Sequence, residues 1–158
     1  MAYGTYDKSV LLPCHSNAGQ ETAIALEAAA GVKFTYDVVE PITVTRFGIK
    51  PTVAFNYDTM TAAAVVKLKK YVTYGSSAGE VELASITLVQ AWAAGNVYYV
   101  DVENALNAAC VDVGEQLVVE VTTQGAGGTE TGDWLPYIMY NPRAEVAANQ
   151  AAMHNITA

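Results

Sequence analysis

Residues Val111 to Val121, with the sequence VDVGEQLVVEV, decide the fold because they join an acidic turn to a half-buried strand. Gly114 allows the positive φ that a sharp turn over Asp112–Glu115 needs. In the strand, alternate residues share a face, and this period of two predicts β-structure. One face holds Leu117, Val119 and Val121, and the other holds Val118, Glu120 and Thr122. A turn and strand of this kind, repeated along a chain, build a β-sandwich.

Working outward, the same kind of pattern recurs between turn signals along most of the chain. Further strands are predicted within Val32–Tyr57, Ala62–Tyr74, Val81–Gln90, Val97–Glu103 and Trp134–Tyr140. Seven or eight short strands predict an all-β fold, a β-sandwich or jelly roll, in a single domain over residues 1–158. No internal repeat or second domain is found.

Several local signals refine this prediction. Pro41 marks a strand boundary or an edge, because proline cannot donate to a central ladder, and Pro51 is expected to interrupt the chain before Val53. The apolar phase changes within Ile42–Ile49, which predicts a bulge near Arg46–Gly48. Gly95-Asn96 is a plausible turn between two neighbouring strands.

The two ends lack the alternation of a buried strand. Residues 1–17 are predicted as an irregular N-terminal arm, and residues 141–158 as a polar, alanine-rich tail. Gln20–Ala30 is left open: its alanines and Gly31 favour a helix, whereas alternation of Thr22, Ile24 and Leu26 favours a strand.

Composition limits the classes of function. Of the 158 residues, 52% are hydrophobic and only 15% are charged, which favours association with a partner. The net charge of −8 argues against nucleic-acid binding through phosphate contacts. The sequence from Glu80 onward contains ten acidic residues and one basic residue, Arg143, whereas the part before Glu80 has a net charge of +1. This acidic half is interpreted as a solvated face.

Processing and redox signals point to a reducing cytoplasm as the place of synthesis and folding. No secretory signal and no apolar run of about 20 residues is present, so no membrane span is predicted. Cys14 and Cys110 are expected to be reduced and buried, although they could pair in an oxidising compartment.

No motif predicts catalysis or a cofactor. Cys14 and His15 are adjacent and would point to opposite faces of a strand, while His154 lies in the tail. Asp101, Glu103, Asp112 and Glu115 do not form the calcium loop signature, and the last two are expected to satisfy backbone donors in their own turn.

The remaining candidates also have structural interpretations. Gly125–Gly128 is expected to be a loop and not a phosphate cradle. Trp92 and Trp134 are expected in the core or at an interface. No histidine is placed to activate a serine. The chain is therefore predicted to be a non-enzyme without metal or cofactor.

Five segments together resemble the head-decoration (cement, capsid-stabilising) proteins of tailed bacteriophages. They are MAYGTYDKSVLLP, VVEPITVTRFGIKPTVAF, VYYVDVENA, VDVGEQLVVEVTTQG and LPYIMYNPRAEVAANQ, which span most of the chain. The resemblance implies a β-rich, commonly trimeric virion protein on the outer capsid surface, bound to the major capsid protein over capsomer junctions. The chain differs from some of these proteins because it has no proline- or glycine-rich N-terminal arm.

Contact with the capsid is expected chiefly from the two ends, Met1–Leu12 and Asn141–Ala158, because tyrosine and arginine are frequent interface anchors. The candidates are Tyr3, Tyr6, Leu11, Leu12, Tyr140 and Arg143. The alternatives are a phage tail or baseplate structural protein, and a carbohydrate-binding β-sandwich module with a row of exposed aromatic residues. A cupin-like enzyme is disfavoured because it needs several histidines close together.

Overall fold

A computed structural model describes residues 8–11, 22–56, 61–73, 75–88, 92–102, 109–127 and 130–142, the first of these ranges by its backbone. This part of the chain contains strands and no helix. The ten strands are β1 (Lys8–Leu11), β2 (Ile24–Ala25), β3 (Gly31–Asp37), β4 (Ile42–Asn56), β5 (Ala64–Tyr71), β6 (Val81–Leu88), β7 (Tyr98–Asp101), β8 (Cys110–Val111), β9 (Gln116–Thr123) and β10 (Thr131–Pro142).

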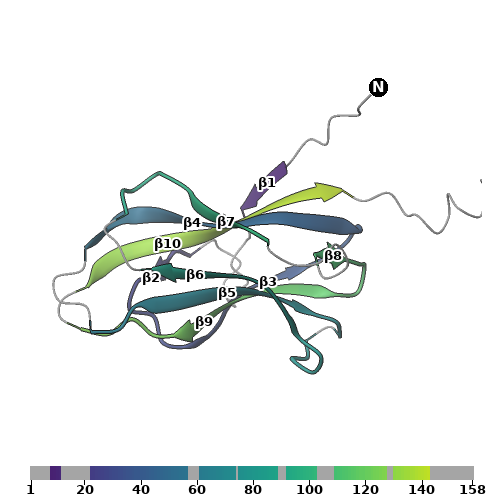
Figure 1. Ribbon diagram of the computed structural model, residues 1–158, viewed down its shortest axis with the longest axis horizontal. Helices are drawn as coiled ribbons and strands as arrows, with labels where there is room; N and C mark the ends of the chain where they lie inside the picture. Colours follow the sequence, from purple (N-terminus) through teal and green to yellow (C-terminus); the bar gives the residue numbers. More distant parts are fainter. Residues whose placement is uncertain are drawn as a thin grey trace, which may run out of the picture.

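The strands form two antiparallel sheets that lie one over the other, as Figure 1 shows. Sheet A has the order β1-β10-β4-β7, with β2 paired to β10 and β8 paired to β4. Sheet B has the order β3-β9-β5-β6. The prediction of an all-β chain is therefore confirmed, and the two layers are compatible with a β-sandwich.

Strand β9 lies inside sheet B. Leu117, Val119 and Val121 face the core as predicted and are at most 2% exposed. Val118, predicted on the other face, is also 0% exposed, so the strand is buried more fully than a half-buried strand. The preceding turn closes through a hydrogen bond from the Glu115 amide to the Asp112 carbonyl, with Gly114 at φ +93°. Residues Val111–Val121 thus contain the predicted turn and strand.

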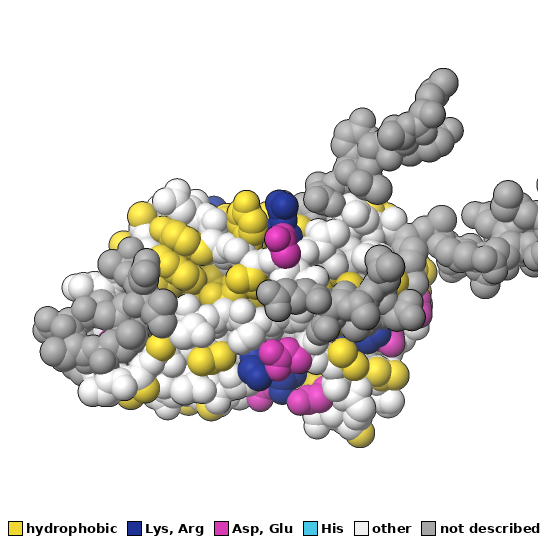
Figure 2. All heavy atoms as spheres, in the orientation of Figure 1, with side chains coloured by type: hydrophobic (Ala, Val, Ile, Leu, Met, Phe, Trp, Pro, Cys, Tyr) yellow, Lys and Arg dark blue, Asp and Glu magenta, His cyan; other side chains and the backbone are white. Residues whose placement is uncertain are grey.

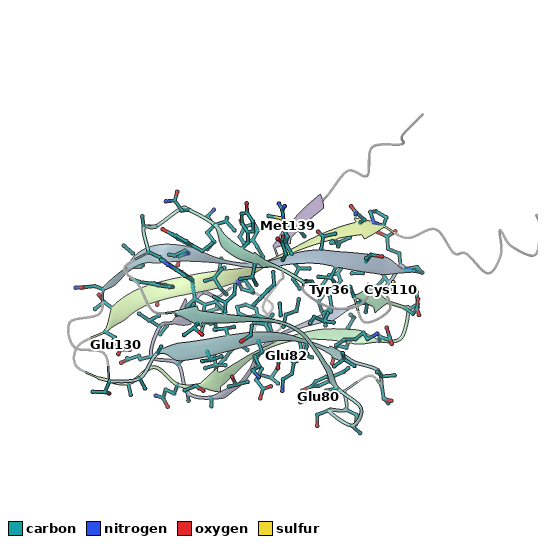
Figure 3. The ribbon with its side chains drawn as sticks, in the orientation of Figure 1. Tyr36, Glu80, Glu82, Cys110, Glu130 and Met139 are labelled. Atoms are coloured by element: carbon teal, nitrogen blue, oxygen red, sulfur yellow. The ribbon has the colours of Figure 1, made fainter. Side chains whose placement is uncertain are left out.

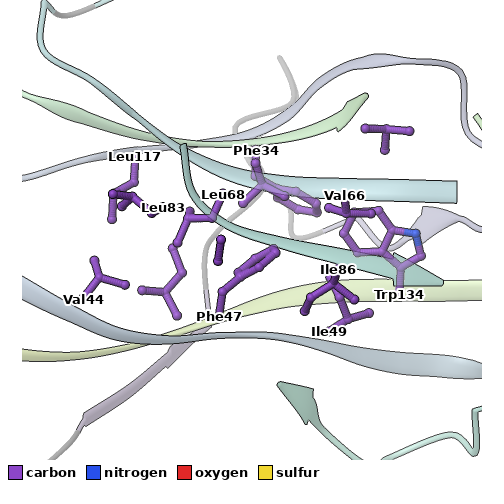
Figure 4. Close-up of a cluster of buried hydrophobic side chains, with 14 of the residues drawn as sticks. Phe34, Val44, Phe47, Ile49, Val66, Leu68, Leu83, Ile86, Leu117 and Trp134 are labelled. Carbon is purple, nitrogen blue, oxygen red and sulfur yellow. The ribbon is translucent and has the colours of Figure 1, made fainter. Parts of the chain in front are cut away.

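The core fills the space between the sheets with side chains from both. Figure 4 shows residues of sheet B facing residues of sheet A across this space. The labelled members are Phe34, Val66, Leu68, Leu83, Ile86 and Leu117 from sheet B, and Val44, Phe47, Ile49 and Trp134 from sheet A.

The predicted phase change in β4 is present, but it lies one residue earlier than Arg46–Gly48. Tyr140 of β10 is opposite Val44 and Met139 is opposite Arg46, so Thr45 is the extra residue of a bulge. Because of this bulge, Val44 and Phe47 both face the core despite their odd spacing.

The expectation that Pro51 interrupts the chain before Val53 is wrong. Pro51 lies within β4, opposite Trp134, where the ladder with β10 is irregular. A proline is tolerated at such an irregular position because the ladder does not require its missing amide hydrogen. Pro41, in contrast, does lie between β3 and β4, as predicted.

The predicted limits of the two ends are also corrected. Lys8–Leu11, expected to be irregular, form β1, because the outer edge of β10 offers free backbone groups for pairing. Asn141 and Pro142, expected in the tail, still belong to β10 opposite β4. In the described part of Gln20–Ala30 there is no helix, but the two-residue β2 and a turn after it.

Strands β6 and β7 follow one another in sequence but lie in different sheets. β6 pairs with β5 in sheet B, whereas β7 pairs with β4 in sheet A. The turn at Gly95 (φ +86°) instead returns the chain onto β4, where its amide donates to the Pro51 carbonyl at 2.9 Å.

Candidate interaction surfaces

The outer face of sheet A presents aromatic rings and cations. Across this face Gly48 of β4 lies between Tyr99 of β7 and Tyr137 of β10. The guanidinium of Arg46 lies 4.9 Å from the centre of the Tyr99 ring and donates to Asp101 Oδ1 at 2.9 Å. Because Tyr99 is 51% exposed, this face offers an aromatic ring and an arginine together to a partner.

Gly48 keeps this face smooth. A Cβ at Gly48 would lie 3.0 Å from Val97 Cγ1, 3.2 Å from the Tyr98 carbonyl oxygen and 3.3 Å from Tyr99 Cβ, so glycine allows the close approach of the 97–99 segment to β4. Lys50 lies 5.8 Å from the centre of the Tyr137 ring, and Val53 is 48% exposed.

The outer face of sheet B carries paired charges. Lys67 contacts Glu82 at 2.7 Å, and Lys69 contacts Glu80 at 2.8 Å and Glu120 at 2.6 Å. The hydrogen bonds to Glu120 and Glu80 raise the pKa of Lys69 above its ordinary range. Figure 2 shows these blue and magenta side chains side by side on the lower layer. A surface whose charges already pair with one another gains less from a charged partner.

A polar contact joins the two sheets near the Asp112–Glu115 turn. The Nζ of buried Lys70 in β5 donates to the Cys110 carbonyl of β8 at 2.9 Å and lies 3.5 Å from Glu115 Oε1. The other oxygen of Glu115 accepts a hydrogen bond from the Asp112 amide at 2.7 Å. For Glu115 this confirms the predicted structural role in the turn. The half-buried Sγ of Cys110 lies 3.8 Å from Thr43 Oγ1.

The two tryptophans occupy different environments. Trp134 is 1% exposed and packs against Phe34 of the other sheet, with ring centres 6.0 Å apart. Trp92 is half-buried between Phe55 and Tyr98, at 5.5 and 4.3 Å between ring centres. Both therefore serve packing, as expected.

Two distinguishing features of the rival classes can be examined in the described residues. Among them, Tyr99 is the only aromatic residue with a largely exposed side chain, whereas a sugar platform needs several in a row. No group of three His, Cys, Asp or Glu side chains in the same residues could hold a metal ion. Within these ranges there is also no helix long and apolar enough to cross a membrane.

The carboxylates for which the sequence predicted no catalytic role do not gather at one place in the described residues. Asp101 pairs with Arg46 on the outer face of sheet A, while Asp112 and Glu115 share a turn. Glu103 lies outside the described residues, as do Cys14, His15 and His154.

Of the six predicted contact residues, Tyr140 alone has a described side chain. Its ring is half-buried and packs against the core from β10. Leu11 lies in β1, opposite Tyr137. The predictions for Tyr3, Tyr6, Leu12 and Arg143 fall outside the described residues.

A buried carboxylate that no sequence signal predicted lies at the start of β10. Glu130 is 8% exposed, and neither of its carboxylate oxygens has a hydrogen-bond partner among the described residues. Burial, and to a lesser degree the charge of Glu27, raises the pKa of Glu130 above its ordinary value. Figure 3 shows Glu130 at one end of the two sheets, well away from Cys110.

The burial of Glu130 predicts that the free energy of unfolding depends on pH. When a carboxyl pKa is higher in the folded state, the unfolded chain ionises first, so stability falls as pH rises from the ordinary value of 4.5 through the folded pKa. Glu130→Gln is therefore expected to be more stable than the wild type at pH 7 in EDTA, because the neutral amide avoids the cost of ionising a buried group. The two proteins should converge at acidic pH.

Urea unfolding between acidic and neutral pH measures this difference. Glu40→Gln removes the same charge from an exposed position and controls for the general relief of negative charge. A constant difference at every pH would contradict the assignment of the cost to ionisation of Glu130.

Comparison with known proteins does not place the chain in a family: no protein-family model, curated protein or solved structure matches it.

Proposed function

We propose that this chain is a structural virion protein, a decoration or cement protein on the outer surface of a tailed-phage head. In this role it binds the major capsid protein, stabilises contacts between capsomers and acts as a homotrimer without catalysis or cofactor. Assembly takes place in the host cytoplasm. The basis is the resemblance of five segments that span most of the chain, together with 52% hydrophobic and 15% charged residues. The jelly-roll form of the sandwich and the terminal arms belong to the same proposal.

The observation that carries the proposal is that both ends of the chain continue from one corner of sheet A. Lys8 at the start of β1 is opposite Tyr140, two residues before the end of β10 at Pro142. Figure 1 shows β1 and the end of β10 side by side. The chain therefore enters β1 and leaves β10 at neighbouring positions, and we infer that one partner surface can engage the segments on both sides.

The two outer faces differ in a way that supports one orientation of the protein on the shell. Sheet A presents Tyr99 and Arg46, residue types that are enriched in protein interfaces, next to the corner where the ends continue. Sheet B presents ion pairs such as Lys67–Glu82, which suit a surface left in water. In the proposal, sheet A is nearer the shell and sheet B faces solution.

Co-sedimentation with mature heads of the encoding phage tests this function. The structure sets the truncations: removing residues 1–7 and 143–158 leaves β1 and β10 complete, whereas removing residues 1–12 would also remove β1. The full chain is expected to sediment with the heads. Each truncation should weaken binding, and the double truncation should weaken it by about 100-fold or more, because two linked contacts act together.

Thermal unfolding of each truncated protein serves as the control, with an unchanged midpoint expected. If the full chain does not bind heads, the proposed function is wrong. If the double truncation folds and binds at full strength, only the role of the ends is wrong. Light scattering tests the free trimer, and a monomer at high concentration would contradict it.

A further inference from the structure

Three segments far apart in sequence meet at the end of the protein where Glu130 lies. The amide of Leu26, in the turn after β2, donates to the Gly132 carbonyl of β10 at 2.8 Å. The side chain of Gln124, just after β9, donates to the Glu27 carbonyl at 3.0 Å. Glu130 thus lies at the start of β10. The segments that follow β2 and β9 are hydrogen-bonded to neighbouring segments at the same place.

Two acceptor oxygens lie close to Gly125 at this junction. A Cβ built on Gly125 would lie 3.0 Å from Glu130 Oε2, 3.4 Å from the Leu26 carbonyl oxygen and 3.5 Å from Ala64 Cβ. Within the described part of the chain neither oxygen of the Glu130 carboxylate receives a hydrogen bond, and the charge of Glu27 acts on it as well. Buried carboxylates are ordinarily paired, hydrogen-bonded or bound to a metal ion, so a positive partner would resolve this arrangement.

We propose that this junction is a calcium site, in which the Glu130 carboxylate, the Leu26 carbonyl and the Glu27 carboxylate hold the ion beside Gly125. The ion ties the turn after β2 and the loop after β9 to the start of β10. The site departs from the expectation of a chain without metal. It does not rest on the proposed function, so the failure of one leaves the other untouched.

The ligand chemistry selects the class of ion. All three groups offer oxygen and none offers nitrogen or sulfur, which suits a hard cation and not zinc or copper. Calcium accepts six to eight oxygens in flexible geometry, and water completes the shell. Because only two carboxylates contribute, the dissociation constant is expected at about 10⁻⁴–10⁻³ M.

Calorimetric titration and thermal unfolding with calcium chloride test the site in the full chain. Calcium at about 10 mM is expected to raise the unfolding midpoint of the wild type by about 3–8 °C, and magnesium by less. Glu130→Gln should abolish both the binding heat and this rise. Glu40→Gln, which removes an exposed charge elsewhere, should respond like the wild type.

Gly125→Ala provides a second variant that changes no charge. Gly125 does not have a positive φ, so alanine fits the backbone, while its Cβ would lie 3.0 Å from Glu130 Oε2 and 3.4 Å from the Leu26 carbonyl oxygen and crowd an ion bound there. The calcium response should be lost although every carboxylate is still present. The proposal is overturned if the wild type shows no binding at this concentration, or if either variant folds and binds calcium as the wild type does.

Discussion

Replacing Gly132 by alanine is expected to destabilise the protein by about 2–6 kcal/mol, through backbone strain and a steric clash. Gly132 lies at a bulge between Thr131 and Asp133, where β4 has the extra residue, and has φ +148°. A Cβ there would lie 2.6 Å from Phe55 Cδ1 and 3.2 Å from Phe55 Cα. Since the second contact is with backbone, a change of rotamer cannot relieve it, and β4 and β10 must separate locally.

Gly31→Ala is the matched control for this prediction. Gly31 has a similar φ of +130°, but a Cβ there would meet no atom within 4 Å. It therefore carries the strain without the clash, and we expect a loss of about 1–3 kcal/mol. Urea unfolding of both variants gives the difference, which measures the clash. Equal losses would show that β4 moves away from position 132 at little cost.

Trp134→Ala is expected to lower the free energy of unfolding by about 3–5 kcal/mol, because it empties space between the sheets. Trp134 is 1% exposed and packs against Phe34 of the opposite sheet. Trp92→Ala, which removes a half-buried ring from a stack on one side of the core, should cost less.

The protein has two tryptophans, so each variant leaves a single fluorescent reporter. Folded Trp92→Ala should emit at shorter wavelength than the folded Trp134→Ala, because its remaining tryptophan is buried. Chemical unfolding followed by this emission and by circular dichroism checks both variants. A larger loss for Trp92→Ala would contradict the placement of the main core at Trp134.

The parts of the fold that follow local patterns could be predicted from sequence. The alternation in β9 and the turn at Gly114 are local, since neighbouring residues alone determine which face is apolar and where φ is positive. The bulge in β4 was predicted within one residue because the apolar phase of a strand must change there. Strand pairing was less accessible: β7 joins sheet A through contacts with distant residues, which the turn at Gly95 does not encode.

The candidate surfaces illustrate the same limit. The ion pairs of Lys69 depend on the register of three strands, and the burial of Glu130 depends on segments before β3 and after β9. Neither has a signature in the sequence near it. Tyr140 was predicted as a contact residue from its type and its place near an end, yet its ring packs against the core because β10 continues past it.

The central place of β10 in sheet A has a consequence for synthesis on the ribosome. The last described strand pairs with β1, β2 and β4, so sheet A joins the first segments of the chain to the last. Until Thr131–Pro142 leave the exit tunnel, β4 lacks its partner along most of its length. Such long-range pairing folds slowly and exposes an unpaired strand edge meanwhile. Nascent chains that stall before β10 should therefore be the aggregation-prone species and the substrates of chaperones.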